Sequence, residues 1–160
     1  MNKMRNMVIR KAEKRDILGL MSLLYQVNAV HHEIRPDLFK GSTTKYEEQE
    51  LAAVLDDDSK PIFVYDDGGI LGHAFCQVSE VRNHRLLQDA KTLYIDDICV
   101  DEQARGRHIG QALYEYVRDY AKSIGCYNIT LNVWEGNDSA YSFYKRMGMR
   151  IQKTGMETIL

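Results

Sequence analysis

The sequence predicts an α/β fold in which helices flank a mixed central β-sheet. An amphipathic helix is predicted over residues 109–124, between apolar segments at 93–100 and 129–133 that are typical of buried strands. Two further strand-like segments, 62–65 and 70–78, flank an Asp-Asp-Gly-Gly turn and predict a β-hairpin. The hairpin is antiparallel, whereas a strand-helix-strand crossover joins parallel strands, so we expect a mixed sheet.

The first half of the chain predicts one strand and two helices before the hairpin. Residues 7–10 are a strand candidate, and a helix is expected to begin at residues 14–16. Its apolar face consists of Ile17, Leu20, Met21, Leu24 and Val27. The segment 31–37 interrupts that pattern, and Pro36 disfavours helical geometry in the residue before it, which predicts a loop or a bent junction. A second helix is expected over 46–55.

The second half predicts the long helix, a strand, a short helix and one or two last strands. The long helix has a single apolar stripe, formed by Ile109, Ala112, Leu113, Tyr116, Val117, Tyr120, Ala121 and Ile124. Gly125 is placed to end it. Asn137 can cap the short helix, which Gly148 would stop, and residues 149–160 would supply the last strands. The expected order is β-α-α-β-β-β-α-β-α-β, in a single domain over residues 1–160.

Composition limits the classes of function. The chain has 160 residues, of which 44% are hydrophobic, and a formal net charge of -2, which disfavours a general nucleic-acid binder. It contains no apolar run suited to a signal peptide or to a membrane span, so we expect no membrane partner and a cytoplasmic location. Cys76, Cys99 and Cys126 are odd in number and far apart, which predicts buried thiols rather than a disulfide framework or a metal site.

The segment Arg105-Gly106-Arg107-His108-Ile109-Gly110 predicts a site for a pyrophosphate. It follows a buried strand and opens the long helix, where unpaired N–H groups and the positive end of the helix dipole attract anions. Glycines allow a phosphate to approach those N–H groups, and the two arginines add positive charge.

Two separated motifs resemble the GCN5-related N-acetyltransferase (GNAT) superfamily, and the resemblance covers nearly the whole chain. The first is the Arg/Gln-x-x-Gly-x-Gly/Ala signature, which is here the segment 105–110 with His108 at the usual first glycine. A side chain at this position causes little backbone strain if the φ of His108 is negative. The second is Asn-x-x-Ala-x-x-Phe-Tyr-x-x-x-Gly, matched by Asn137, Ala140, Phe143, Tyr144 and Gly148. The resemblance implies the GNAT fold, with acetyl-CoA as acyl donor and no metal.

The resemblance also implies which residues would hold acetyl-CoA. The pantetheine arm would add like a strand to Ile98, Cys99 and Val100, where a backbone N–H could stabilise the oxyanion. The pyrophosphate would lie on the loop and the first helical turn, formed by Arg105, Gly106, Arg107, His108, Ile109, Gly110 and Gln111. Asn137 and Ser139 would contact the donor from the other side. Tyr144 takes the position of the general acid that protonates the departing thiolate.

The acceptor amine needs a group that removes its proton, and Asp96 and Asp97 are the candidates. Only one should face the substrate, because a strand alternates faces, unless a bulge intervenes. The segment 93–97 and the run Phe-Tyr-Lys-Arg at 143–146 resemble the spermidine/spermine N-acetyltransferase branch, where a Glu at the position of Asp96 lies by the amine. We therefore predict Asp96 as the catalytic anchor or base, acting directly or through water.

The resemblance places the loop between the first two helices at the wall of the acceptor site. His32 and Glu33 are therefore substrate-contact candidates, together with Asp96 and Asp97. Adjacent histidines at 31–32 do not form a ligand geometry unaided, and we expect no metal. The acidic side chains favour a small cationic amine, with a polyamine as the first choice.

The sequence therefore predicts an acetyl-CoA-dependent N-acetyltransferase in which a primary amine attacks the acetyl group directly. Two alternatives stay open: an acetyltransferase acting on protein lysines or chain N-termini, and a non-catalytic acyl-CoA-binding sensor module. The resemblance also implies a homodimer, with residues 156–160 as a plausible exchanged edge.

Overall fold

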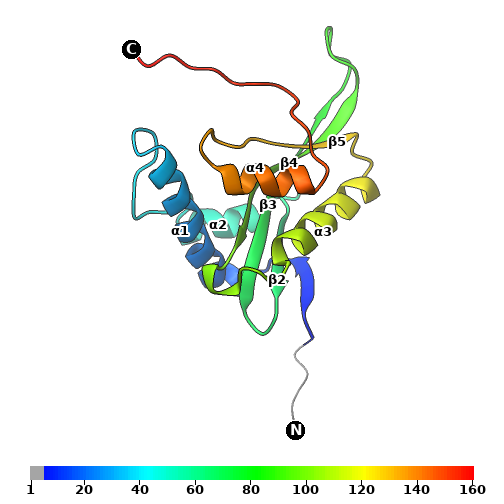
Figure 1. Ribbon diagram of the computed structural model, residues 1–160. Helices are drawn as coiled ribbons and strands as arrows, with labels where there is room; N and C mark the ends of the chain where they lie inside the picture. Colours follow the sequence, from blue (N-terminus) through cyan, green and yellow to red (C-terminus); the bar gives the residue numbers. More distant parts are fainter. Residues whose placement is uncertain (1–5) are drawn as a thin grey trace.

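The computed structural model describes residues 6–160, and within them one five-stranded sheet is flanked by four α-helices (Figure 1). The elements are β1 (Val8–Lys11), a 3₁₀ turn (Lys14–Asp16), α1 (Ile17–Ile34), α2 (Glu48–Leu55), β2 (Ile62–Asp66), β3 (Ile70–Val81), β4 (Ala90–Val100), a 3₁₀ turn (Glu102–Ala104), α3 (Ile109–Ser123), β5 (Asn128–Leu131) and α4 (Asp138–Arg146). The predicted fold class, a mixed sheet flanked by helices, is confirmed.

The strands lie in the order β1-β2-β3-β4-β5, so that each pairs with its neighbour along the chain. The first four strands are antiparallel, and β4 pairs with β5 in parallel through the α3 crossover. Strands β3 and β4 are longer than the segments predicted for them, since β3 continues to Val81 and β4 begins at Ala90, and the hairpin that they form projects beyond the sheet (Figure 1). The sheet is therefore mixed, as the hairpin and the crossover together require.

Each face of the sheet has its own apolar core. On one face α3 packs on alternate residues of the central strands, among them Phe63, Ala74 and Leu93. On the other face α1 and α2 pack on Val64 and Phe75. Because strand side chains alternate between faces, neighbouring residues of one strand belong to different cores.

Glycines bring α3 close to the sheet and end the helices as predicted. A Cβ on Gly72 would lie 3.0 Å from side-chain atoms of Ile109 and Leu113, so only glycine leaves room for this packing. Gly125 follows α3 at φ +80°, and Gly148 follows α4 at φ +93°. The left-handed conformation at the residue after a helix favours glycine.

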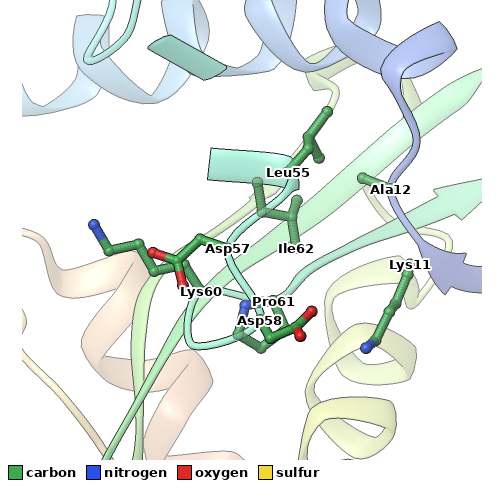
Figure 2. A pocket seen from close by; sticks show the side chains of 8 residues that line it. All are labelled: Lys11, Ala12, Leu55, Asp57, Asp58, Lys60, Pro61 and Ile62. Atoms are coloured by element: carbon green, nitrogen blue, oxygen red, sulfur yellow. The ribbon is translucent and has the colours of Figure 1, made fainter. Parts of the chain in front are cut away.

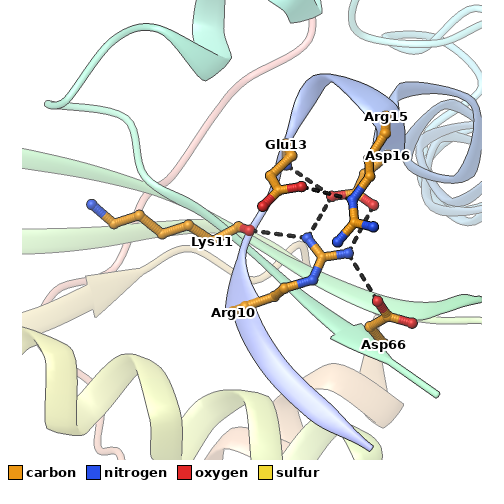
Figure 3. A network of polar contacts seen from close by, with 6 residues as sticks. All are labelled: Arg10, Lys11, Glu13, Arg15, Asp16 and Asp66. Atoms are coloured by element: carbon orange, nitrogen blue, oxygen red, sulfur yellow. Dashed lines mark hydrogen bonds and ion pairs between the residues drawn. The ribbon is translucent and has the colours of Figure 1, made fainter. Parts of the chain in front are cut away.

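A network of charged groups joins the beginning of α1 to the edge of the sheet (Figure 3). The Arg10 guanidinium donates to both oxygens of Asp16, at 2.7 and 3.0 Å, and to Asp66 at 2.9 Å. Asp16 also accepts from the backbone N–H of Glu13 at 2.8 Å and is only 6% exposed. Burial alone would raise the pKa of Asp16, but the Arg10 and Glu13 hydrogen bonds outweigh it and the pKa is lowered.

Two expectations differ from the structure. Helix α1 continues through His31 to Ile34 and ends at Arg35, immediately before Pro36, so the predicted interruption at residue 31 is wrong. The helix continues because only the residue next to a proline is restricted. The last strands expected over 149–160 are also absent from the described chain, and the element order ends with α4.

The C-terminal segment leaves α4 as an extended ribbon that passes above α1 (Figure 1). Its residues form no ladder with β5, and an ion pair between Glu157 and Arg35 holds it near the end of α1 instead. Ile151, Met156 and Ile159 are largely exposed. An apolar pattern of this kind becomes a strand only where a partner strand satisfies its backbone groups.

Candidate active site

The edge of β4 is unpaired on one side over its last residues. The β4–β5 ladder ends with the pair Ile95–Leu131, whereas β4 continues to Val100 and keeps pairing with β3. Among residues 6–160, no strand pairs with the backbone groups that follow Ile95 on the β5 side. This splayed edge contains Ile98, Cys99 and Val100, the residues predicted to pair with a strand-like ligand.

A β-bulge at Asp96 places both candidate carboxylates on the same face of the sheet. Phe75 pairs with Asp97 and Cys76 pairs with Ile95, so Asp96 is the extra residue. Ile95 and Ile98, three positions apart, both contact the core beneath α3. Asp96 and Asp97 lie between them and face the α1 side, where Asp96 pairs with Lys45. The bulge is the exception to strand alternation that sequence reasoning had left open.

The segment before α3 forms an exposed turn that leaves helix N–H groups free. The first helical hydrogen bond runs from the Ala112 N–H to the His108 carbonyl at 3.1 Å, so the preceding N–H groups have no partner within the helix. Gly106 adopts φ +82° and His108 adopts φ +59°. His108 therefore occupies the left-handed region, and the condition that it has a negative φ is not met. Histidine is among the side chains that adopt this region more often than most.

Of the two arginines in the turn before α3, Arg107 forms an ion pair within the protein. Arg107 donates to Asp67, in the turn between β2 and β3, at 3.0 Å, and this contact fixes the turn before α3 against the hairpin. Arg105 is exposed, and its positive charge lowers the pKa of the Cys99 thiol slightly. Burial outweighs that effect and raises the pKa of Cys99 to about 12, so this side chain is a protonated thiol.

Tyr144 of α4 lies beside the splayed edge of β4. Its ring packs against Phe143 and Tyr114, at centroid distances of 5.0 and 6.4 Å. Burial raises the pKa of its hydroxyl, and the negative charge of Asp97 raises it further, while a backbone hydrogen bond from Ile98 acts in the opposite direction. Tyr144 is therefore a neutral phenol that can donate a proton at this edge.

The two carboxylates have different surroundings. Asp96 forms an ion pair with Lys45 of the α1–α2 loop, with 3.2 Å between Oδ2 and Nζ. Asp97 has no ion pair within the described part of the chain. Burial raises the pKa of Asp97, while electrostatic interactions with His31 and Lys45 oppose the shift. A carboxylate with a raised pKa is a stronger base, so Asp97 is suited to accept a proton.

An aromatic cluster lies on the α1 side, and its member His31 acts electrostatically on Asp97. His31 packs against Phe39 at 5.0 Å, and Phe39 meets the edge of Trp134 at 5.6 Å between ring centroids. Arg35 lies 5.5 Å from the Trp134 ring and also pairs with Glu157. Three separate segments, the end of α1, the following loop and the segment after β5, therefore meet at this cluster.

The structure places the other predicted site residues as follows. His32 directs Nδ1 to the Phe39 carbonyl at 2.7 Å, and its ring packs on Gly41, so it holds the loop. Glu33 and Ser139 are exposed, and Asn137 caps α4 by accepting from the Ala140 N–H at 3.3 Å. The contacts of the predicted residues with a donor or an acceptor remain predictions.

Sequence reasoning missed Lys45, Phe39 and Trp134. Each lies in a loop without periodicity or a motif, and only the fold brings them together. A lysine three residues before the start of a capped helix carries no signal of an active site.

Two hollows of the surface lie away from the candidate site. A space of about 50 Å³ between β1, α2 and β2 is lined by Lys11, Ala12, Leu55, Asp57, Asp58, Lys60, Pro61 and Ile62 (Figure 2). This volume holds a few waters and no metabolite. A wider depression beside the β3–β4 hairpin contains none of the predicted site residues either. Within residues 6–160 no group of three or more His, Cys, Asp or Glu side chains could hold a metal ion, and no helix is suited to cross a bilayer.

A splayed strand edge and an exposed helix N-terminus are suited to bind a thioester that carries phosphate groups, and a neighbouring phenol is suited to donate a proton to it. The model of the acetyltransferase (GNAT) family matches residues 27–149. The chain therefore belongs to this family of acyltransferases.

Individual relatives agree with this assignment. Glucosamine 6-phosphate N-acetyltransferase from Arabidopsis thaliana is 36% identical over 59 residues, which cover 37% of this chain and 38% of that protein. An uncharacterized N-acetyltransferase from Methanocaldococcus jannaschii is 34% identical over 92 residues, 57% of this chain and 39% of that protein. The matched region thus spans about two fifths of these curated relatives.

Solved structures match over nearly the whole chain. A mutant of the BH1408 protein from Bacillus halodurans has a TM-score of 0.90 and 31% sequence identity, over 96% of this chain and 99% of that one. The crystal structure of the Arabidopsis thaliana glucosamine-6-phosphate N-acetyltransferase has a TM-score of 0.70 at 24% identity, over 96% and 98% of the two chains. The second likeness supports the fold alone.

Proposed function

We propose that this protein transfers an acetyl group from acetyl-CoA to the primary amine of a small cationic metabolite. The observation that carries the proposal is the splayed edge of β4, which has Tyr144 on one side and the carboxylates Asp96 and Asp97 on the other. Amide formation from an ammonium and a thioester requires a proton acceptor for the ammonium and a proton donor for the leaving thiolate. The two sides of this strand edge offer one of each.

The donor-binding residues are those of the strand edge and of the turn before α3. The backbone of Ile98, Cys99 and Val100 offers hydrogen bonds to an extended amide-bearing arm, and the N–H groups from Gly106 to Gln111 offer them to a pyrophosphate. Acetyl-CoA supplies the acetyl group when bound. A backbone N–H of the strand edge stabilises the negative charge that develops on the carbonyl oxygen.

The acid and base roles follow from the electrostatics of the site. Tyr144 keeps its proton near neutral pH, because burial raises its pKa, and donates it from Oη to the leaving sulfur. Asp96 anchors the acceptor ammonium and takes its proton directly or through a water. Asp97 lies beside it with a raised pKa and can share that proton.

The buried thiol of Cys99 disfavours a covalent acetyl-enzyme. Its pKa of about 12 leaves almost no thiolate at neutral pH, and its Sγ donates to the Leu23 carbonyl at 3.5 Å. This supports direct attack by the amine. Cys99→Ala is therefore expected to retain turnover.

The proposed acceptor class rests on the carboxylate pair, and a polyamine is one member of that class. The test is thiol release from acetyl-CoA with a panel of polyamines, amino sugars, amino acids and peptides. Turnover on small amines that falls with both Tyr144→Phe and Asp96→Asn supports the proposal. Turnover on peptides alone would assign a protein acceptor, and donor binding without turnover on any amine would assign a sensor module.

We also propose a homodimer in which the C-terminal segment pairs with a second copy. Met156 and Ile159 are 94% and 72% exposed, and β5 is an edge strand of only four residues. Edge strands and exposed apolar segments favour pairing between chains. Light scattering on the wild type and on a Met156→Ser, Ile159→Ser variant tests this, and a monomeric wild type would overturn it.

A cytoplasmic location is proposed from the cysteines. Cys76, Cys99 and Cys126 are free thiols, and two of them are buried. Free thiols are typical of reducing compartments.

A further inference from the structure

Lys45 supplies the cation that occupies the acceptor side of this site. Its ammonium lies 3.2 Å from Asp96 and 5.3 Å from the centroid of the Tyr46 ring. Tyr46 in turn stacks on Phe75, which pairs with Asp97 in the sheet. The Lys45 ammonium thus contacts Asp96, the carboxylate that is proposed to anchor the acceptor.

Lys45 has the same chemistry as the proposed acceptor, because its side chain is an alkyl chain that ends in a primary ammonium. Its contact with Asp96 shows that the site accommodates such a group. The side chain is also 44% exposed, and long exposed lysines adopt other rotamers at small cost. An incoming ammonium can therefore take its place.

We infer that Lys45 is a specificity-determining residue whose ammonium competes with the acceptor for Asp96. A diamine must displace Lys45 and leave it without a partner. An acceptor with one ammonium and one anionic group displaces Lys45 and then pairs its anion with the freed lysine. This inference rests on the proposed function: it keeps acetyl transfer to a small primary amine, but favours an amine that also carries an anionic group over a polyamine.

The test compares two acceptors of matched length, cadaverine and δ-aminovalerate, which differ in having a second ammonium or a carboxylate. Lys45→Met keeps the length of the side chain and removes its charge. We expect KM for cadaverine to fall roughly threefold to fivefold and KM for δ-aminovalerate to rise by a similar factor, the range of a partly exposed ion pair. When Asp96→Asn is added to Lys45→Met, the decrease in KM for cadaverine should disappear.

Two control variants accompany this measurement. Lys45→Arg keeps the charge and should leave the ratio of the two KM values unchanged. Lys40→Met removes an exposed lysine from the same loop and should change neither of the two KM values. A loop-positioning role for Lys45 predicts that both KM values move in the same direction, and that result would overturn the inference.

Calorimetric titration of both amines separates this inference from the proposed function. Opposite changes in Kd on Lys45→Met, in a protein that turns over neither amine, would support the role of Lys45 and reject the proposed reaction. Absence of binding of both amines to the wild type would overturn the inference as well. Turnover with an unchanged preference would overturn the inference alone.

Discussion

The two faces of the sheet are built from different kinds of sequence. The candidate donor site comes from the end of β4 and from two contiguous segments with recognisable motifs, 105–111 and 137–148. On the α1 face, the proposed acceptor side combines His31, Lys45 and the carboxylates Asp96 and Asp97, which come from three distant parts of the chain. The proposed donor site is therefore marked largely by local motifs, whereas the proposed acceptor side depends on tertiary structure, and a change in one face should leave the other largely intact.

The largest effect is expected at the charged network that holds the α1 face. Asp16→Asn removes the more buried of the two carboxylate partners of Arg10, at a site that is 6% exposed, and we expect the free energy of unfolding to fall by about 3 kcal/mol. Urea unfolding measures this change. Asp56→Asn, which breaks an exposed pair with Lys14, is the matched control and should cost under about 1 kcal/mol.

Amide hydrogen exchange of the Asp16→Asn variant would sharpen the comparison between the faces. Exchange should increase more in α1 than in α3, because the network contacts the beginning of α1. Equal increases in both helices would mean that the two faces unfold as one unit.

The next effect concerns catalysis. Tyr144→Phe keeps the ring and its packing but removes the proposed acid, so kcat should fall about 100-fold while acetyl-CoA affinity is retained. Steady-state kinetics and calorimetry measure the two quantities. Tyr141→Phe on the exposed side of α4 is the control. An equal decrease in kcat in that variant would contradict the assignment of Tyr144 as the acid.

A smaller effect is expected from His73, which is fully buried on the α1 face with no hydrogen-bond partner for either ring nitrogen among the described residues. Burial lowers its pKa to about 3, whereas an unfolded chain protonates histidine near 6.5. Its contribution to stability is therefore complete above pH 6.5 and declines as pH falls toward 3.

The measurement is the free energy of unfolding at two pH values. The wild type should lose about 2 kcal/mol between pH 7 and pH 5 from this group, and His73→Leu should lose correspondingly less. His84→Gln, at an exposed position, should keep the wild-type pH dependence. An unchanged slope in His73→Leu would show that other groups govern the acid sensitivity.

The smallest effect is expected on the donor side. His108→Gly relieves a left-handed backbone conformation, and stability should rise by about 0.5–1 kcal/mol with donor affinity retained. Thermal unfolding with and without CoA measures both. His108→Ala retains a Cβ and should gain nothing, so equal gains in the two variants would assign the effect to the imidazole.

Most of the fold could be predicted from the sequence, because its helices carry clear periodicity and its turns carry glycines. Asn137, Gly125 and Gly148 act at helix ends as expected. The last strands could not be predicted correctly, because an apolar alternation in residues 149–160 does not say whether a partner strand is available.

The candidate site could be predicted only in part. Motif spacing located Tyr144 and the turn before α3, and residue type located Asp96 and Asp97. The shared face of the two carboxylates depends on a bulge, and the ion pair with Lys45 depends on a loop contact. Neither has a local sequence signal, because both result from pairing between segments distant in the chain.

The bulge in β4 has a consequence for how the gene can change. Loss of one codon from a central strand normally turns every later side chain to the opposite face. Loss of the codon for Asp96 would instead restore strict alternation, with Ile98 and Val100 still in the core beneath α3 and Asp97 still on the other face. This strand is therefore expected to tolerate deletion of that single codon. The deletion would remove one of the two carboxylates of the proposed acceptor side in one mutational event.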